Sequence, residues 1–266
     1  NSSANGKLAR RSGFARVHIP SAPADDGNAL GAVLYCAHAL RGEARSSQTF
    51  SPYLGSRPDP RRLEFVAQLV GCPQHELADH ELCAVVAKLL AAGRIIVWMQ
   101  GQAEFGPRAL GNRSILADPR PPDMRDRINA RVKFREDYRP LAPSILHEYG
   151  AEFFADYEES PYMERALLFH PHVRARIPAV VHADGTGRLQ TVKRSWNPRF
   201  YDLISAFHAL TGIPLLLNTS FNVMGRPIVH SIEDALTVFH TTGLDALIIE
   251  NRLFVKDTSD LPHSRS

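Results

Sequence analysis

The sequence predicts an α/β protein of the α+β type, with a mixed sheet and flanking helices. Segments with the 3.6-residue spacing of amphipathic helices alternate with short runs of apolar residues, the pattern expected when helices and strands interleave. Hydrophobic residues make up 44% of the 266 residues, which is enough for one well-buried core and a second small unit.

The first part of the chain differs from the rest in composition. Residues 1–45 contain several turn-forming sequences and a small, apolar, helix-like stretch at 29–40, which we expect to pack tightly. Residues 46–62 are polar and interrupted by prolines, as is typical of an exposed linker. We therefore place the main domain at residues 63–257, followed by a disordered tail at 258–266.

Helices and strands alternate through the main domain. Helical periodicity predicts helices at residues 81–92, 120–132, 200–211 and 232–242. Short apolar runs predict strands at residues 95–99, 141–146, 190–192, 215–217, 228–229 and 246–249. Gly93 fits the end of the first helix, and Ser231, with acidic residues after it, is expected to cap the last one.

The bulk composition argues against several classes of protein. Lysine and arginine (31) nearly balance aspartate and glutamate (28), and a net charge of +3 does not suggest a nucleic-acid or membrane binder. The apolar runs are too short to cross a bilayer. The three cysteines follow no metal-ligand spacing, and their odd number argues against a disulfide framework, so we expect a reducing, cytoplasmic setting.

The densest group of potential binding residues lies at 101–120, directly after a predicted strand. Arg108 and Arg113 stand five residues apart in an expected loop that also contains glycines. Glycine lets backbone amides approach an anion closely, and a guanidinium group can bind two phosphate oxygens at once. The alternative is a solvated loop whose arginines pair with Glu104 and Asp118.

A second basic cluster follows the helix predicted at 120–132. Between residues 108 and 139 the chain has nine basic and five acidic side chains, a local excess of four. Lys133 and Arg135 would point from one face of a strand. Cations beside a core are costly unless an anion neutralises them, so we interpret Lys133 and Arg139 as ligand-binding residues. A plain surface charge run explains the arginines before them, Arg125, Arg127 and Arg131.

Small polar residues follow the strand predicted at 215–217. Asn218, Thr219, Ser220 and Asn222 come just before a turn at a glycine. Hydroxyl and amide groups at the end of a strand can hydrogen-bond a phosphate or a ribose. A simple capped turn explains the same residues equally well.

A turn rich in glycine, at residues 182–187, precedes the strand predicted at 190–192. It is followed by Arg188 and Gln190, which share a strand face because side chains two residues apart point the same way. On these residues alone, a plain hairpin is the better interpretation.

Four segments taken together resemble one known family. They are Glu104-Phe-Gly-Pro-Arg-Ala-Leu-Gly-Asn-Arg-Ser-Ile-Leu-Ala-Asp-Pro-Arg120, Lys133-Phe-Arg-Glu-Asp-Tyr-Arg-Pro-Leu-Ala-Pro143, Asp184-Gly-Thr-Gly-Arg-Leu-Gln-Thr-Val192 and Asn218-Thr-Ser-Phe-Asn222. These segments occur in the same order, and with many identical residues, in the C-terminal half of the NodU/CmcH-type O-carbamoyltransferases. The resemblance extends from about residue 81 to Asp257. Residues 1–45 resemble the end of that family's N-terminal, Kae-like domain.

The resemblance implies a fold and an activity. The fold is a YrdC-like domain with a twisted mixed sheet, preceded by a short fragment of the Kae-like (ASKHA) domain. In the family, the YrdC-like domain takes carbamoyl phosphate and ATP, with Mg²⁺, and forms carbamoyl adenylate. The Kae-like domain then transfers the carbamoyl group to a hydroxyl of a sugar, an antibiotic or another small-molecule acceptor. Because the chain opens at Asn1 rather than Met, we expect a missing N-terminal domain and an incomplete enzyme.

The resemblance also assigns residues by position. The phosphate and nucleotide pocket would comprise Arg108, Arg113, Lys133, Arg139, Arg188 and Ser220, with Asn222 as a weaker match. Arg108, Lys133 and Arg139 are the expected catalytic residues, because cations can offset the charge of two phosphorylated reactants. Asp26 matches an aspartate that helps hold a divalent, Fe²⁺-type metal in the Kae-like domain, and its partner ligands would lie outside this chain.

Two other functions fit parts of the pattern. A free-standing YrdC-type synthase, which makes threonylcarbamoyl adenylate for tRNA modification, has stretches similar to residues 133–135 and 220–222. Such proteins lack the 104–108 segment and the long insertion around 147–182. A catalytically idle RNA- or nucleotide-binding module is the third possibility, and the balanced charge argues against it.

Overall fold

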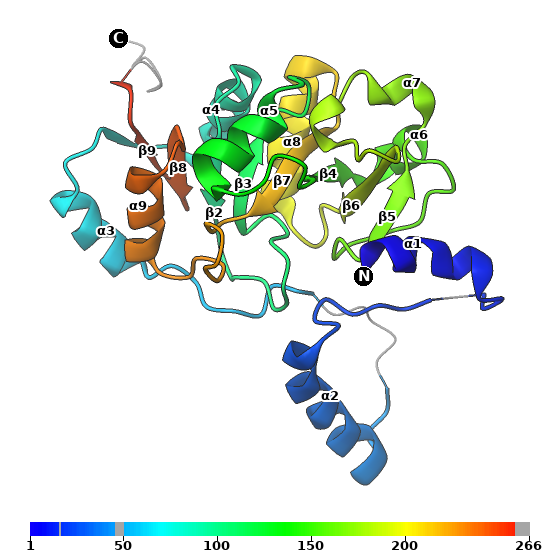
Figure 1. The fold of residues 1–266 in the computed structure, drawn as a ribbon. Helices are drawn as coiled ribbons and strands as arrows, with labels where there is room; N and C mark the ends of the chain where they lie inside the picture. Colours follow the sequence, from blue (N-terminus) through cyan, green and yellow to red (C-terminus); the bar gives the residue numbers. More distant parts are fainter. Residues whose placement is uncertain (16, 46–50, 259–266) are drawn as a thin grey trace.

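The computed structural model describes residues 1–15, 17–45 and 51–258. A mixed sheet runs through the molecule, and helices pack along it (Figure 1). The first residues of the predicted linker lie outside the described residues, as does all but the first residue of the predicted tail at 258–266.

The sheet contains nine strands from the described part of the chain. In spatial order they are β1 (Gln74–Glu76), β9 (Arg252–Val255), β8 (Ala246–Ile249), β2 (Ile96–Met99), β3 (Arg113–Ala117), β7 (Leu215–Ser220), β4 (Ala142–Leu146), β6 (Thr186–Val192) and β5 (Arg165–Leu168). The pairs β2–β8 and β4–β6 are parallel, and the other neighbouring pairs are antiparallel. The predicted α/β class with a mixed sheet is therefore confirmed.

The described part of the chain also contains nine α-helices, most of which flank this sheet. In chain order they are α1 (Ser2–Arg11), α2 (Asn28–Tyr35), α3 (Pro60–Leu69), α4 (Asp79–Ala91), α5 (Met124–Ile128), α6 (Gly150–Phe153), α7 (Pro171–Arg174), α8 (Pro198–Thr211) and α9 (Ile232–Thr241). α4 and α8 pack against each other along the central strands, and α3 packs against α9 beside β8 (Figure 1). Within the described ranges, no helix has both the length and the apolar character needed to cross a membrane.

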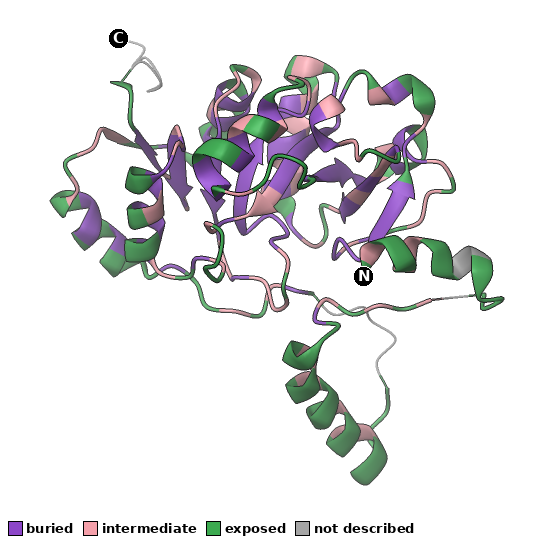
Figure 2. Ribbon diagram, viewed as in Figure 1, coloured by how far each residue is buried: buried purple, intermediate pink, exposed green. Residues whose placement is uncertain are grey.

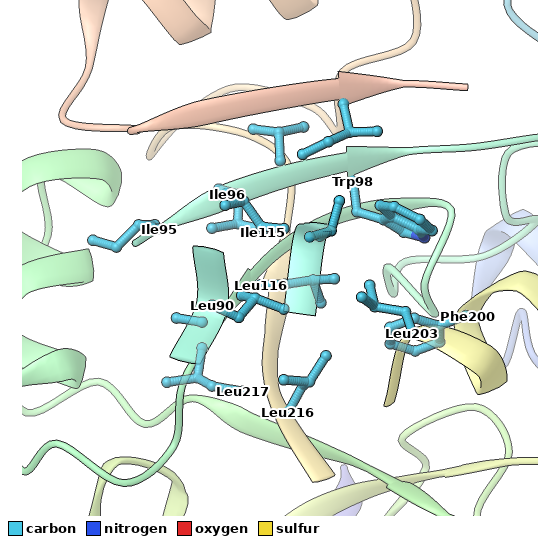
Figure 3. Close-up of a cluster of buried hydrophobic side chains, with 14 of the residues drawn as sticks. Leu90, Ile95, Ile96, Trp98, Ile115, Leu116, Phe200, Leu203, Leu216 and Leu217 are labelled. Carbon is cyan, nitrogen blue, oxygen red and sulfur yellow. The ribbon is translucent and has the colours of Figure 1, made fainter. Parts of the chain in front are cut away.

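The hydrophobic core lies between the central strands and the helices α4 and α8. Figure 3 shows its centre, where side chains of β2, β3 and β7 meet Leu90 of α4 and Phe200 of α8. These two side chains and Trp98 on β2 are completely buried. Burial of one such side chain contributes roughly 1.5–3 kcal/mol. The strands that carry polar residues at their ends are thus held in place by the buried hydrophobic core.

The two predicted helix-end signals are confirmed. Gly93 directly follows Ala92, the C-cap of α4, and has a φ of +79°. α8, whose end signals were not predicted, is capped by Asn197, which accepts a hydrogen bond from the N–H of Phe200 at 3.1 Å. Ser231 caps α9 by accepting a hydrogen bond from the N–H of Asp234 at 3.1 Å.

Three predicted elements differ from the structure. Residues 228–229 form no strand: they follow a turn at residues 224–225, and the N–H of Val229 donates a hydrogen bond to Phe221 O, just after β7, at 2.8 Å. The helix predicted at 120–132 begins only at Met124, after two prolines, and continues into a π-helical turn, η3 (Asn129–Lys133). Residues 113–117, expected to be a loop, form the central strand β3.

The segment before the main domain divides into two parts. α1 packs on the edge strand β5, where Asn5 Nδ2 donates a hydrogen bond to Glu164 O at 2.9 Å. α2 extends away from the sheet, and Figure 2 shows it exposed along its length. The tight packing predicted for residues 29–40 is therefore wrong for this chain, because α2 has no buried residue.

Candidate functional site

One pocket brings together most of the predicted phosphate-binding residues. It has a volume of about 260 Å³ and lies where the ends of β6 and β7 meet the segments that precede β3 and β4. It is lined by Pro107, Arg108, Ala109, Arg135, Arg139, Pro140, Met163, Arg188, Asn218, Thr219 and Ser220. This lining contains four arginines and no acidic side chain.

Strand register directs several of these side chains to one face of the sheet. Residues that pair across neighbouring strands point the same way, as do residues two apart along a strand. Ser144 on β4 pairs with Gln190 on β6 and lies two residues from the partner of Asn218 on β7. Arg188, Asn218 and Ser220 therefore point from the same face, although they are far apart in the sequence.

Three of the arginines meet in the pocket without a carboxylate partner. Arg108 comes from the loop before β3, Arg135 from the turn after η3, and Arg188 from β6. Burial, together with the charges of Arg108 and Arg135, lowers the pKa of Arg188 to about 10. Within the described residues, none of the three forms an ion pair. Like charges held this close repel one another, so the pocket favours an anion.

The same arginines leave hydrogen-bond donors unused. Arg188 Nε and Arg135 Nη2 are buried, and in the described part of the chain neither has a hydrogen-bond partner. A buried donor without a partner costs roughly 1–3 kcal/mol. An anion with several oxygen atoms would supply the missing acceptors.

Arg139 lies at the rim of the pocket. Its Nε donates a hydrogen bond to Glu136 Oε2 at 2.9 Å, and both side chains are about half exposed. Exposed ion pairs of this kind contribute at most about 1 kcal/mol. The pair can therefore open at little cost and release Arg139 to a ligand.

Lys133 lies beside the pocket, against Ser220. It belongs to the turn η3, after which Phe134 adopts a left-handed conformation, so the prediction that Lys133 and Arg135 share a strand face is wrong. Its Nζ contacts Ser220 O and donates a hydrogen bond to Asn222 Oδ1 at 2.7 Å. Burial, together with the charge of Arg135, lowers the pKa of Lys133 to about 7. Lys133 can thus exchange a proton near neutral pH.

Asn222 does not line the pocket but orders its edge. Its Oδ1 accepts hydrogen bonds from Ser220 Oγ at 2.8 Å and from Lys133, and its Nδ2 donates to Arg226 O at 2.7 Å. Asn222 therefore positions Ser220 and Lys133, and no polar atom of it is aimed at the arginines.

Arg113 lies apart from the pocket. Its neighbour Ser114 pairs with Ser220, so Arg113 points from the opposite face of β3. Its side chain is 1% exposed and donates hydrogen bonds to backbone oxygens, including Gln100 O at 2.8 Å and Ser56 O at 3.1 Å. The Arg113 side chain thus stabilises the backbone at the end of β2 and lies on the other face of the sheet from the predicted pocket residues.

The loop that carries Arg108 is organised by Glu104. Glu104 Oε1 accepts hydrogen bonds from the N–H groups of Leu110 at 2.6 Å and of Asn112 at 2.8 Å. The alternative in which Glu104 pairs with the loop arginines as side chains therefore does not describe this structure. Because its carboxylate is used on the backbone, Arg108 remains available to the pocket.

Asp26 lies in a short turn, η1 (Asp25–Gly27), at the start of α2. It is exposed, and its Oδ1 accepts a hydrogen bond from the N–H of Ala24 at 3.2 Å. No group of three or more metal-binding side chains occurs within residues 1–15, 17–45 and 51–258. Asp26 therefore does not form a metal site with the residues described, and its role as a ligand stays a prediction.

Several pocket residues were not assigned by the sequence. Arg135 and Thr219 belong to the polar clusters that the sequence showed, but they were not assigned to the pocket. Asn218 lies two residues before Ser220 on the same strand, so the two side chains share a face, and this spacing could have identified Asn218. Met163 had no such signal, because only the tertiary structure brings the segment before β5 to the pocket.

More than half of the chain matches a known protein family. The family described as carbamoyltransferase C-terminus matches residues 87–256. The chain belongs to this carbamoyltransferase family. The match confirms the resemblance inferred from the four sequence segments, and it contains the whole arginine pocket.

Curated relatives agree with this membership. The chain is 44% identical over 266 residues to nodulation protein NolNO of Sinorhizobium fredii, which covers 97% of this chain and 39% of that protein. It is 36% identical over 244 residues to nodulation protein U of Rhizobium tropici, covering 92% and 40%. It is 35% identical over 245 residues to 3'-hydroxymethylcephem-O-carbamoyltransferase of Amycolatopsis lactamdurans, covering 89% and 43%. The carbamoyltransferase chain spans less than half the length of these relatives.

Solved structures give weaker matches. Full-length HypF in its phosphate- and nucleotide-bound form has a TM-score of 0.47 at 19% identity, covering 64% of this chain and 25% of that one. Sua5 of P. abyssi, complexed with L-threonine, has a TM-score of 0.45 at 14% identity, covering 66% and 48%.

Proposed function

We propose that this carbamoyltransferase domain binds carbamoyl phosphate and ATP and forms carbamoyl adenylate, for transfer to a hydroxyl of a small molecule. The observation that carries the proposal is the convergence of Arg108, Arg135 and Arg188 in one pocket without a carboxylate. Two phosphorylated reactants bring several negative charges together, and preorganised cations would offset their repulsion.

The proposed reaction has two steps. Water releases phosphate from carbamoyl phosphate and leaves carbamate. A carbamate oxygen then attacks the α-phosphorus of ATP, the bond from that phosphorus to the bridging oxygen breaks, and pyrophosphate leaves. No side chain needs to act as a nucleophile, so catalysis depends on positioning and on charge stabilisation.

The pocket residues divide these tasks. The three arginines would bind phosphate oxygens, and Arg139 would join from the rim when it leaves Glu136. Lys133, with its pKa near 7, would take up a proton as negative charge accumulates beside it. Ser220 lies between Lys133 and the pocket and links the two.

A wider hollow next to the pocket would receive the nucleoside. It has a volume of about 620 Å³, shares Pro140 with the arginine pocket, and is lined by Tyr138, His182 and Asp184 among others. The exposed ring of Tyr138 provides an apolar surface for a base. Mg²⁺ would arrive bound to ATP, as is usual for nucleotide substrates.

The transfer step and the acceptor belong to the longer proteins of the family. The name of the Amycolatopsis relative states an O-carbamoyltransferase acting on a hydroxymethylcephem. By analogy, we propose a hydroxylated small molecule as the acceptor here. Asp26 alone supplies no metal site, so we assign no step to a metal of the Kae-like domain.

A pyrophosphate-release assay tests the proposal. The chain is incubated with MgATP alone, with carbamoyl phosphate added, or with threonine and bicarbonate added. We expect release only with carbamoyl phosphate, and we expect Arg108→Gln to reduce the rate on the order of 100-fold. Arg194→Gln, at an exposed arginine paired with Asp202, is the matched control and should leave the rate unchanged.

Other results would reject the proposal. Release that depends on threonine and bicarbonate would instead indicate a threonylcarbamoyl-adenylate synthase. No release under any condition, together with salt-sensitive RNA binding, would indicate a binding module.

A further inference from the structure

Residues 52–56 lie against the loop that carries Arg108, although they precede the part of the chain that matches the carbamoyltransferase family. We call these five residues the strap. The N–H of Gly55 donates a hydrogen bond to Ala103 O at 2.9 Å, and the N–H of Ala103 donates one to Ser56 O at 3.0 Å. A Cβ added at Gly55 would lie 2.9 Å from Ala103 Cβ, so the two backbones approach closely. The strap is thus attached to the loop by its backbone.

The side chain of Tyr53 connects the strap to the backbone next to the pocket. Its hydroxyl group donates a hydrogen bond to Leu110 O at 2.8 Å. Gln190 Nε2 donates to the same oxygen, also at 2.8 Å. Leu110 is 1% exposed, and the two residues before it, Arg108 and Ala109, line the pocket. Two hydrogen bonds therefore hold the backbone directly after these lining residues.

The surroundings of Tyr53 keep its hydroxyl group protonated. Burial raises the pKa of Tyr53 above its usual value, and the charge of Glu104 also raises it. A carbonyl oxygen only accepts, so the hydroxyl group is the donor to Leu110 O. Glu104 in turn accepts a hydrogen bond from the N–H of Leu110 at 2.6 Å. Glu104 and Gln190 belong to the matched domain, whereas Tyr53 belongs to the strap.

The ring of Tyr53 packs beside the pocket as well. It contacts a small apolar cluster formed by Leu110, Ala142, Tyr162 and Met163. Met163 lines the pocket with a φ of +56°, a conformation that a residue other than glycine keeps only when its surroundings hold it. Phenylalanine at position 53 would keep this packing and remove only the hydrogen bond to Leu110 O.

We infer that Tyr53 is a positioning residue for the proposed reaction: through Leu110 O, its hydroxyl group holds Arg108 where the guanidinium group can bind phosphate. The inference rests on the proposed function and adds to it a residue from outside the matched domain. Within the described residues Arg108 has no ion-pair partner, so its position depends on the backbone of its loop. Without the hydrogen bond from Tyr53 the loop can shift, and phosphate should bind about 3- to 10-fold more weakly.

Calorimetric titration of the full chain with inorganic phosphate tests this. Tyr53→Phe should bind about 3- to 10-fold more weakly than the wild-type chain, with its fold, checked by circular dichroism, retained because Gln190 still donates to Leu110 O. Tyr201→Phe is the matched control, since it removes an exposed hydroxyl group that donates to Glu148, and it should bind as the wild-type chain does. Equal binding by all three proteins, or none by the wild-type chain, would overturn the inference.

A double-mutant cycle separates positioning from a general structural effect. It compares kcat/KM for pyrophosphate release with carbamoyl phosphate in the wild-type chain, Tyr53→Phe, Arg108→Gln and the double variant. Tyr53→Phe should lower this value about 3- to 10-fold in the wild-type chain and leave it unchanged once Arg108 is replaced. An equal loss in both backgrounds would overturn the inference. A wild-type chain that binds inorganic phosphate but releases no pyrophosphate would instead reject the proposed function, and the titration would still decide whether Tyr53 positions Arg108.

Discussion

Lys133 holds its ammonium group among neutral oxygen atoms of Ser220 and Asn222, and its surroundings make it the clearest pH-sensitive residue of the site. Burial, with the charge of Arg135, lowers its pKa from 10.5 to about 7. Between these two values the unfolded chain binds one more proton than the folded chain, so the stability contributed by this residue rises with pH. Below pH 7 both states are protonated and this contribution is absent.

The substitution Lys133→Met tests this linkage, because methionine fills the space and does not titrate. The free energy of unfolding of the wild-type chain, relative to the variant, should rise by up to about 1.4 kcal/mol per pH unit from pH 7 to pH 9. Urea denaturation at several pH values measures the difference. Parallel curves for the two proteins over this range would show that Lys133 keeps an ordinary pKa.

At the residue scale, four of the seven residues predicted to bind phosphate or nucleotide line the pocket. Arg108, Arg139, Arg188 and Ser220 line the pocket, as the resemblance implied. Arg113 does not, because the alternation along β3 turns it away from the face that carries Ser220. The error follows from treating residues 113–117 as a loop. Side chains alternate between two faces only along a strand, so the direction of Arg113 could not be predicted until this segment was recognised as a strand.

At the scale of elements, Gly111 allows the loop that carries Arg108 to lie close against Phe200 of α8. Its φ of +105° disfavours any side chain, and an added Cβ would lie 2.2 Å from Phe200 Cδ1. Gly111→Ala should therefore lower the free energy of unfolding by about 2–4 kcal/mol, through strain and overpacking together. Thermal or urea denaturation gives the value.

Gly212 provides a matched control for this substitution. It also has a positive φ, +71°, but an added Cβ would meet no atom within 4 Å. Gly212→Ala should cost only about 1 kcal/mol, from backbone strain alone. Equal losses for the two variants would show that the contact between Gly111 and Phe200 has no energetic consequence.

Periodicity predicted the long elements well and the short ones poorly. α4, α8 and α9 carry their own apolar spacing and end signals, so they could be located without tertiary information. The strands β1, β5 and β9 are only three or four residues long, and their identity depends on the neighbours with which they pair. Residues 133–135 were mistaken for part of a strand because Lys133 and Arg135 have the spacing of a strand face, whereas Lys133 ends η3 and Phe134 is left-handed.

At the scale of the whole molecule, the sheet gathers the site. β4, β6 and β7 are adjacent in space but separated in sequence, and their order brings Arg188, Asn218 and Ser220 to one face. No local pattern reveals this order, so the convergence of the site could be expected only from the family resemblance. No such pattern indicated how α2 would be placed, and its exposure was not foreseen.

A binding titration of three proteins tests most directly whether the arginine pocket holds the phosphate of carbamoyl phosphate. Arg188→Gln removes a buried guanidinium group from the pocket, while Arg194→Gln makes the same change in charge at an exposed site. We predict that Arg188→Gln weakens carbamoyl phosphate binding about 10- to 100-fold and that Arg194→Gln leaves it unchanged. Equal binding by the wild-type chain and both variants would contradict the claim.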